Sequence, residues 1–228
     1  NEKIKVILNE KNEGFAKANN QGIIYALEKK YDYILLLNND TRIRMDLIKN
    51  LVHSSLSNNL PIIQPLILNS EGDKVWNAGG VINKFFGIFN TNLQGKSFTP
   101  NLNFNSETDW FTGCCCLFKA QIFHNEGMFD ENFFAYYEDV DYSLRLKNKG
   151  YKIGLLTKTY LIHHGSMSSK SDESSEGKLS PYVHYLAIRN HIYLLRKHSK
   201  SFNIFGVFLN QFLKIISYSF YFIIRFRF

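Results

Sequence analysis

Hydrophobic and polar positions in the first third of the chain alternate between strand-like runs and helix-like spacing. The pattern predicts, in order, a strand at residues 3–8, a helix at 14–30, a strand at 33–37, a helix at 46–60 and a strand at 62–68. Tyr33–Leu37 is a continuous apolar run, which is typical of a strand buried on both faces. Pro65 favours an edge position or a bulge in the last strand. Strands that alternate with helices in this way predict a parallel sheet with right-handed crossovers.

The rest of the chain shows weaker periodicity. Residues 75–105 are rich in Gly, Asn and Phe and indicate irregular hairpins or a binding loop. The remaining elements are expected as a strand at 109–119, a short helix at 120–126, a helix at 138–149, a strand at 151–156 and a helix at 181–197. Residues 166–178 are rich in Ser and Gly, with Met167 as the one large apolar residue, which favours a mobile loop.

The stretch Phe133–Gly150 concentrates chemical groups. Glu138, Asp139 and Asp141 crowd the start of its helix, where exposed amides and the positive end of the helix dipole stabilise acidic groups. Asp141 and Arg145 are four residues apart and can pair on one helix face. The aromatic residues before the helix could form a wall that raises the pKa of a carboxylate and makes it a base. The alternative is a purely structural acidic helix start packed on aromatic rings.

Residues 202–224 form an aromatic and aliphatic run with a narrow polar stripe. Polar or small residues recur in steps of three or four, at Asn203, Gly206, Asn210, Lys214, Ser217 and Tyr221. The run is long enough to span a bilayer. The stripe and the central Lys214 favour instead a helix lying in the membrane interface, with its arginines at the lipid headgroups. Burial of this helix against protein is the third interpretation.

Composition and charge separate the body of the chain from its end. The 228 residues, 45% of them hydrophobic, are sufficient for one substantial domain. Eight of the 27 Lys and Arg residues lie from Lys178 onward, where none of the 20 acidic residues lies, so the first 177 residues carry 19 basic against 20 acidic residues. The cationic end favours membrane lipid or nucleic acid as a partner. The net charge of the first 177 residues is close to zero, which argues against nucleic acid. The consecutive Cys114–Cys116 fit neither a disulfide framework nor a spaced zinc motif, which indicates a reducing compartment.

Three clusters of acidic or metal-competent residues fall at predicted strand or loop ends. Asp40 follows Asn38 and Asn39 at the carboxyl end of a strand, where parallel sheets bind ligands. The other two clusters are Glu138–Asp139 and His163–His164. If the three converge, carboxylate and imidazole groups could hold a divalent ion beside a base. Taken singly, the first cluster is also compatible with a simple turn, and the histidines with ordinary loop residues.

Taken in series, several segments match one family. They are Asn12–Gly22, Leu35–Asp40, Gly113–Cys115, Gly127–Phe134, Tyr137–Asp141 with Arg145, and His163 with Ser168. Their order and spacing resemble family 2 glycosyltransferases of the GT-A fold, especially the bacterial rhamnosyltransferase-like branch, over roughly residues 4–197. The resemblance implies an inverting hexosyltransferase. It would move a sugar from a nucleotide-diphosphate donor to a hydroxyl of a glycan or lipid-linked acceptor in surface polysaccharide biosynthesis.

The resemblance also implies roles for individual residues. Asp139 matches the general base, with Glu138 beside it. Asp40 and His163 match ligands of a divalent metal, Mg²⁺ or Mn²⁺, with His164 as the runner-up for the second ligand. The positions that match donor or acceptor contacts are Asn12, Gly14, Asn20, Asn38, Asn39, Trp110, Gly113 and Tyr137. The serine-rich loop after His164 matches a lid that orders over the donor.

These observations predict an α/β fold with a GT-A-type mixed, mainly parallel sheet flanked by helices and a C-terminal amphipathic helical tail. The expected divisions are a catalytic domain at 1–177, a basic helical connector at 178–200 and a membrane-associating helix at 201–228. The family normally begins with a strand, a helix and an acidic loop that grip the nucleotide base. These do not precede Asn1, so we interpret the chain as an N-terminally incomplete part of an enzyme. We expect a cytoplasmic protein, peripheral on the inner face of the cell membrane; the alternative is a truncated or non-catalytic domain that binds nucleotide-sugar or membrane.

Overall fold

The computed structural model describes residues 4–100, 106–165 and 181–224, and a mixed β-sheet forms its centre. In spatial order the main strands are β1 (Tyr33–Leu37), β8 (Cys115–Lys119), β3 (Ile62–Leu68), β9 (Ile153–His163) and β2 (Thr41–Ile43). β3 and β9 pair in parallel, whereas β8 is antiparallel to both β1 and β3, and β2 is antiparallel to β9. β1, β3 and β9 therefore run in one direction, and the predicted mixed α/β fold is confirmed.

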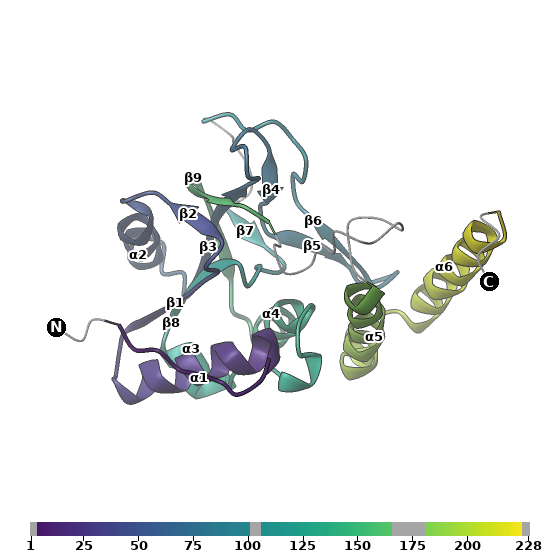
Figure 1. Ribbon diagram of the computed structural model, residues 1–228, viewed down its shortest axis with the longest axis horizontal. Helices are drawn as coiled ribbons and strands as arrows, with labels where there is room; N and C mark the ends of the chain where they lie inside the picture. The colour runs from purple at the N-terminus through teal and green to yellow at the C-terminus, as the bar shows by residue number, and fades with distance from the viewer. Residues whose placement is uncertain (1–3, 101–105, 166–180, 225–228) are drawn as a thin grey trace.

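Helices cover both faces of this sheet (Figure 1). On one face pack α1 (Gly14–Glu28), α3 (Gln121–Glu126) and α4 (Glu138–Asn148), and on the other packs α2 (Leu47–Ser57). Successive strand residues point to opposite faces. Phe118 thus lies in the core with Tyr142 of α4, whereas Leu117 lies in the core with Leu51 of α2. The central sheet is thus packed between helices on both faces.

A separate hairpin connects the sheet to the C-terminal helices. It consists of β5 (Gly80–Asn83) and β6 (Ile88–Thr91), and it contacts both α5 (Pro181–Lys197) and α6 (Ile204–Ile224). A Cβ on Gly206 would lie 2.2 Å from the carbonyl oxygen of Phe85, so only glycine allows this approach. Asn210 Nδ2 donates a hydrogen bond to the Phe86 carbonyl at 3.0 Å. Two members of the predicted polar stripe therefore face protein, and α6 extends outward beyond the hairpin (Figure 1).

The short elements complete the chain. They are β4 (Val75–Asn77), which pairs with β3, β7 (Glu107–Thr108), which pairs with β9, and the 3₁₀ turns η1 (Glu131–Phe133) and η2 (Ser199–Ser201). Within the described ranges, no helix combines the length and the hydropathy that crossing a bilayer requires.

Three strand predictions differ from the structure, and the first of them is wrong. Residues 4–8 form no regular secondary structure, and Ile4 and Leu8 are 84% and 89% exposed, because no described strand pairs with them. The strand expected at 109–119 begins only at Cys115, and the residues before it form an irregular segment. The strand expected at 151–156 is instead the first part of β9, which continues to His163 because β3 and β2 pair with its second half.

The other elements agree more closely with the pattern. The expected helices at 14–30, 46–60, 138–149 and 181–197 are present as α1, α2, α4 and α5. Pro65 lies in a central strand and not at an edge, and the register of β3 against β9 shifts directly after it, so the bulge prediction is confirmed. The loop expected at 166–178 lies outside the described residues. The proposed domain limits remain predictions.

Candidate active site

A cavity of about 610 Å³ lies where β9 and the segment after β1 meet the start of α4. This volume is within the ~300–1,000 Å³ range of small-molecule sites. Eight of the candidate residues line it, namely Asn38, Asp40, Trp110, Gly113, Tyr137, Glu138, Asp139 and His163. The three acidic and histidine clusters, which are far apart in sequence, therefore converge on one cavity.

The carboxylate of Asp139 is fixed by two backbone amides. Gly113 N donates to Oδ2 at 3.0 Å and Val140 N donates to Oδ1 at 2.8 Å. A Cβ at Gly113 would lie 2.5 Å from the ring of Phe15, so a glycine is needed for this approach. Burial raises the pKa of Asp139 to about 6, although the hydrogen bonds to Gly113 and Val140 lower it. The group is therefore ionised at neutral pH yet basic enough to accept a proton.

Glu138 lies beside Asp139 in a drier environment. Its side chain is buried, and its Oε2 has no hydrogen-bond partner among the described residues. Burial, followed by the charge of Asp139, raises the pKa of Glu138 well above its usual range. The two neighbouring carboxyl groups therefore differ in environment, because backbone amides donate to both oxygens of Asp139 while the Oε2 of Glu138 has no partner among the described residues.

Asp40 and His163 form the second polar group of the cavity. Pairing of β2 with β9 brings them together, since Thr41 lies opposite His163. His163 Nε2 lies 3.1 Å from Asp40 Oδ1, but Asp40 Oδ1 has no partner with hydrogen-bond geometry in the described structure. Burial lowers the pKa of His163, although Asp40 opposes the shift, so the imidazole is neutral and can act as a ligand. The ring packs edge-on against Trp76 at 4.4 Å between centroids.

The Asp40–His163 pair fits a divalent cation better than an ion pair. Two neighbouring ligands of an octahedral ion at about 2.1 Å lie about 3 Å apart, which matches the Nε2–Oδ1 spacing. The unpartnered Oδ1 is the orphaned acceptor that a cation would occupy. Within the described ranges, no group of three or more His, Cys, Asp or Glu side chains is placed to hold a metal. Such an ion would need ligands from a bound diphosphate or water, which is the usual arrangement for Mg²⁺.

His163 and His164 differ in orientation. His163 is buried and lines the cavity, whereas His164 is exposed and is absent from the lining. The backbone amide of His164 donates to the Asp40 carbonyl at 2.9 Å. This geometry favours His163 over His164 as the candidate ligand.

Four candidate residues lie outside the cavity lining. Asn12 Oδ1 accepts from Gly14 N at 2.9 Å, and Gly14 has a φ of +81° and packs directly on Phe134. Asn20 is buried and exchanges hydrogen bonds with the backbone of Phe129. Asn39 is exposed in the turn after β1. In the structure Asn12, Gly14 and Asn20 form local hydrogen bonds or packing contacts. A contact of these residues with a donor nucleotide remains a prediction.

Several lining residues were not predicted. They are Phe15, Trp76, Asn77, Phe89, Thr91, Gln94, Thr112, Cys114, Ala135, Val140, Val183 and Ala187, whereas the lining residue Tyr136 belongs to the aromatic wall expected before the helix. Many come from β4, β6 and the segments around the hairpin, which the sequence identified only as irregular hairpins or a binding loop. Val183 and Ala187 come from α5, whose apolar pattern does not distinguish a core contact from a cavity wall.

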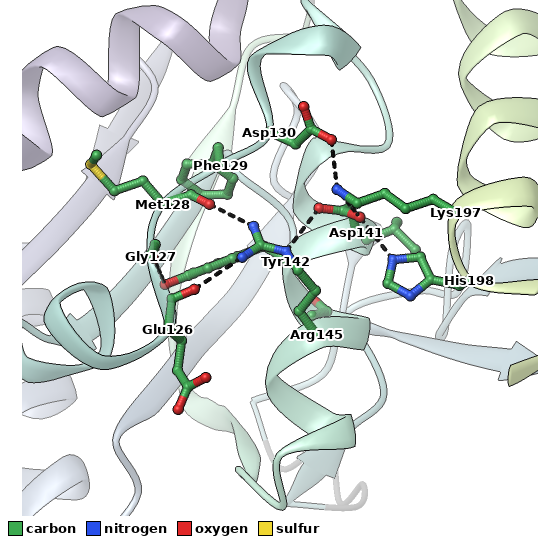
Figure 2. A network of polar contacts seen from close by, with 12 residues as sticks. Glu126, Gly127, Met128, Phe129, Asp130, Asp141, Tyr142, Arg145, Lys197 and His198 are labelled. Carbon is green, nitrogen blue, oxygen red and sulfur yellow. Dashed lines mark hydrogen bonds and ion pairs between the residues drawn. The ribbon is translucent and has the colours of Figure 1, made fainter. Parts of the chain in front are cut away.

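A polar network around the buried Asp141 joins the start of α4 to the end of α5 (Figure 2). Asp141 is fully buried, and Arg145 Nε donates to its Oδ2 at 3.1 Å, as the spacing predicted. Lys197 Nζ and His198 Nε2 lie 2.9 and 2.8 Å from its Oδ1. Lys197 also pairs with Asp130 at 2.6 Å. Burial alone would raise the pKa of Asp141, but the contacts with His198 and Lys197 outweigh it and lower the pKa.

The mixed α/β fold is similar to that of a solved GT-A glycosyltransferase. The crystal structure of GalNAc-T7 with UDP, GalNAc and Mn²⁺ superposes on 82% of this chain and 35% of that chain, with a TM-score of 0.57 and 14% identity, which shows the fold alone. The chain belongs to the glycosyl transferase family group 2, whose family model matches residues 33–218.

Two curated relatives extend this assignment. The low-salt glycan biosynthesis hexosyltransferase Agl10 of Haloferax volcanii is 31% identical over 183 residues, which cover 78% of this chain and 56% of the relative. The dTDP-rhamnosyl transferase RfbF of Shigella flexneri is 30% identical over 198 residues, which cover 86% of this chain and 64% of the relative. The chain thus spans less than two thirds of the length of each relative. The rhamnosyltransferase-like resemblance is confirmed.

Proposed function

We propose that the cavity transfers a sugar from a nucleoside-diphosphate donor to a hydroxyl of a glycan or lipid-linked acceptor, with inversion at the anomeric carbon. One observation carries the proposal: Asp139, a carboxylate with a raised pKa, lines the same cavity as the Asp40–His163 pair. A base and a place for a charged leaving group are the two requirements of this reaction. The names of the two relatives favour surface-glycan synthesis and a hexosyl or rhamnosyl donor.

In the proposed mechanism, Asp139 removes the proton of the acceptor hydroxyl as that oxygen attacks the anomeric carbon. The bond between the anomeric carbon and the diphosphate oxygen breaks, and the diphosphate leaves with the electron pair. The amides of Gly113 and Val140 hold both oxygens of Asp139 in place during this step. Trp110 and Tyr137, which line the cavity, would contact the sugar and the acceptor.

We propose Asp40 and His163 as the protein ligands of a divalent ion, Mg²⁺ or Mn²⁺. When bound, the ion would supply positive charge against the leaving diphosphate. Asn38 lines the cavity on the same turn as Asp40, but its amide is neutral, so one protein carboxylate holds the ion here. Affinity for the ion should therefore depend strongly on the diphosphate.

The test of this proposal is diphosphate release from a panel of nucleoside-diphosphate sugars by the full-length protein, with and without a chelator. Transfer should require the divalent ion. Asp40→Asn should raise the Mn²⁺ concentration for half-maximal activity at least about tenfold, since even outer-shell partners of metal ligands contribute that much. The matched control is Asp73→Asn in an exposed turn. Full activity in excess chelator, or an unchanged Mn²⁺ requirement in Asp40→Asn, would contradict the metal assignment.

A non-catalytic domain that binds nucleotide-sugar is the second candidate. It is favoured by the position of Asn38 and by the small number of metal-competent side chains in the described ranges. The same panel separates the two functions, because a binding domain would retain the donor without releasing diphosphate.

We further propose that α6 docks on the inner, cytoplasmic face of the cell membrane. Gly206 and Asn210 face the hairpin, whereas Phe208 and Phe212 are 70% and 51% exposed and stack on each other. A row of exposed aromatic residues in a basic segment is suited to a lipid surface that carries anionic headgroups. Such docking would present the cavity to a lipid-linked acceptor.

Replacing Phe208 and Phe212 together with Ser should weaken binding to vesicles containing anionic lipid at least about tenfold, because each buried aromatic side chain contributes about 1.5–3 kcal/mol. Co-sedimentation with phosphatidylglycerol vesicles measures this change. The control replaces Tyr31 and Met45 with Ser; both are exposed apolar side chains, but they lie on the body of the protein. Equal binding by the wild type and the Phe variant would exclude α6 as the docking element.

A further inference from the structure

The backbone that leads into Glu138 and Asp139 is held in an uncommon conformation. Phe134, Tyr136 and Tyr137 have φ values of 62°, 71° and 71°. Bulky aromatic residues rarely adopt this left-handed region, and they remain there only where surrounding contacts hold them. The segment therefore requires support from outside itself.

One buried side chain supplies much of this support. Asn190 of α5 is completely buried, and its Nδ2 lies within hydrogen-bond distance of three carbonyl oxygens, those of Phe133 at 2.8 Å, Ala135 at 2.7 Å and Tyr136 at 2.8 Å. Buried carbonyl groups that lose their donor destabilise a structure, so the three oxygens and one amide depend on each other.

Arg189, the residue before Asn190, also donates hydrogen bonds to carbonyl oxygens of this segment. Arg189 donates to the carbonyl oxygens of Asn132 at 2.8 Å and Phe133 at 3.0 Å, and its Nε donates to the Asn190 Oδ1 at 2.8 Å. The remaining carbonyl, that of Phe134, accepts from the Ala16 amide at 3.2 Å. Every carbonyl from 132 to 136 thus accepts a hydrogen bond, and four of the five accept from α5.

We propose that Asn190 is a positioning residue for sugar transfer, and this proposal rests on the proposed function. Its carboxamide holds the left-handed segment so that Tyr136, Tyr137 and Asp139 face the cavity together. All three line the cavity, whereas Asn190 does not. Without the carboxamide the segment can relax, and the base moves relative to the acceptor hydroxyl although no group of the cavity has been removed.

The test is Asn190→Ala in the full-length protein. The turnover number should fall about 10²-fold, the cost of a misplacement of about 1 Å, while the dissociation constant of the Mn²⁺–nucleoside diphosphate complex changes less than about threefold. Amide hydrogen exchange should accelerate at residues 132–139 and not in the central strands. The control is Asn58→Ala, which removes an amide-to-carbonyl hydrogen bond at the end of α2, away from the cavity, and should leave the turnover number unchanged.

Two results would overturn the proposal. One is an unchanged turnover number in folded Asn190→Ala, and the other is unchanged exchange at residues 132–139. If the wild type transfers no sugar, the proposed function fails, and the exchange measurement still decides whether Asn190 holds the segment. If Asn190→Ala does not fold, Arg189→Met replaces it, since Arg189 is partly exposed and holds two of the same carbonyls. A smaller loss in the same direction is then expected, and no loss counts against the proposal.

Discussion

Replacing Asp139 with Asn should lower the turnover number for sugar transfer about 10³-fold, within the range that a positioned base contributes, and should change donor affinity less than about threefold. Asn preserves the shape of the side chain and can keep one of the two bonds to the Gly113 and Val140 amides. It cannot accept the acceptor proton. Single-turnover measurement of transfer, together with titration of the nucleoside diphosphate, separates the chemical step from binding.

The pH dependence provides a second measurement of the same role. Because the base must be ionised and burial raises its pKa to about 6, the wild-type kcat/KM should rise with pH through about 6 and then level off. Asp139→Asn should lose this dependence along with its activity. Asp46→Asn, at an exposed ion pair with Arg44, is the control and should retain the wild-type profile. A wild-type turnover number in Asp139→Asn would end the assignment of this residue as the base.

The pattern of apolar residues predicted an element correctly where the neighbouring elements bury those residues. The apolar run Tyr33–Leu37 was expected to be buried on two faces, and Ile34 and Leu36 lie in one core while Tyr33 and Leu35 contact the other. The same reasoning failed for residues 4–8. Alternating residues there resemble a strand, but a strand needs a partner, and the sequence does not show which edges are paired.

The candidate site was predicted in its acidic part and in the wall formed by Trp110 and Tyr137, but the wall that comes from β4 and the hairpin was missed. Carboxylates and histidines at strand and helix ends are visible in a sequence because polar residues interrupt apolar runs there. Trp76 and Phe89 come from a segment with weak periodicity, and their place in the cavity depends on how the hairpin folds back over the sheet. Similarly, the pairing of Asp141 with Arg145 follows from helical spacing, but its contacts with Lys197 and His198 join residues more than fifty positions apart.

Replacing Asp141 with Asn should destabilise the protein by about 3 kcal/mol, the lower end of the cost of breaking a buried ion pair, because the cationic partners remain partly solvated. Asn fills the same space but leaves Arg145, Lys197 and His198 without their shared negative charge. A loss of this size corresponds to a decrease of about 6–12 °C in Tm for a chain of this length. Urea denaturation at neutral pH measures it, with Glu107→Gln, in an exposed pair with Lys152, as a control that should cost less than about 1 kcal/mol.

The sign of the pH effect separates this role from simple packing. The pKa of Asp141 is lowered on folding, so its ionised form contributes stability above the pKa of the unfolded chain, and this contribution is lost as the pH falls through the folded pKa. The difference in unfolding free energy between wild type and Asp141→Asn should therefore be complete above about pH 4, near the unfolded value, and should narrow under more acidic conditions. A difference that stays constant into acid would mean that the side chain acts through its shape. A decreasing difference would show that charge fastens the start of α4, and with it Asp139, to the end of α5 (Figure 2).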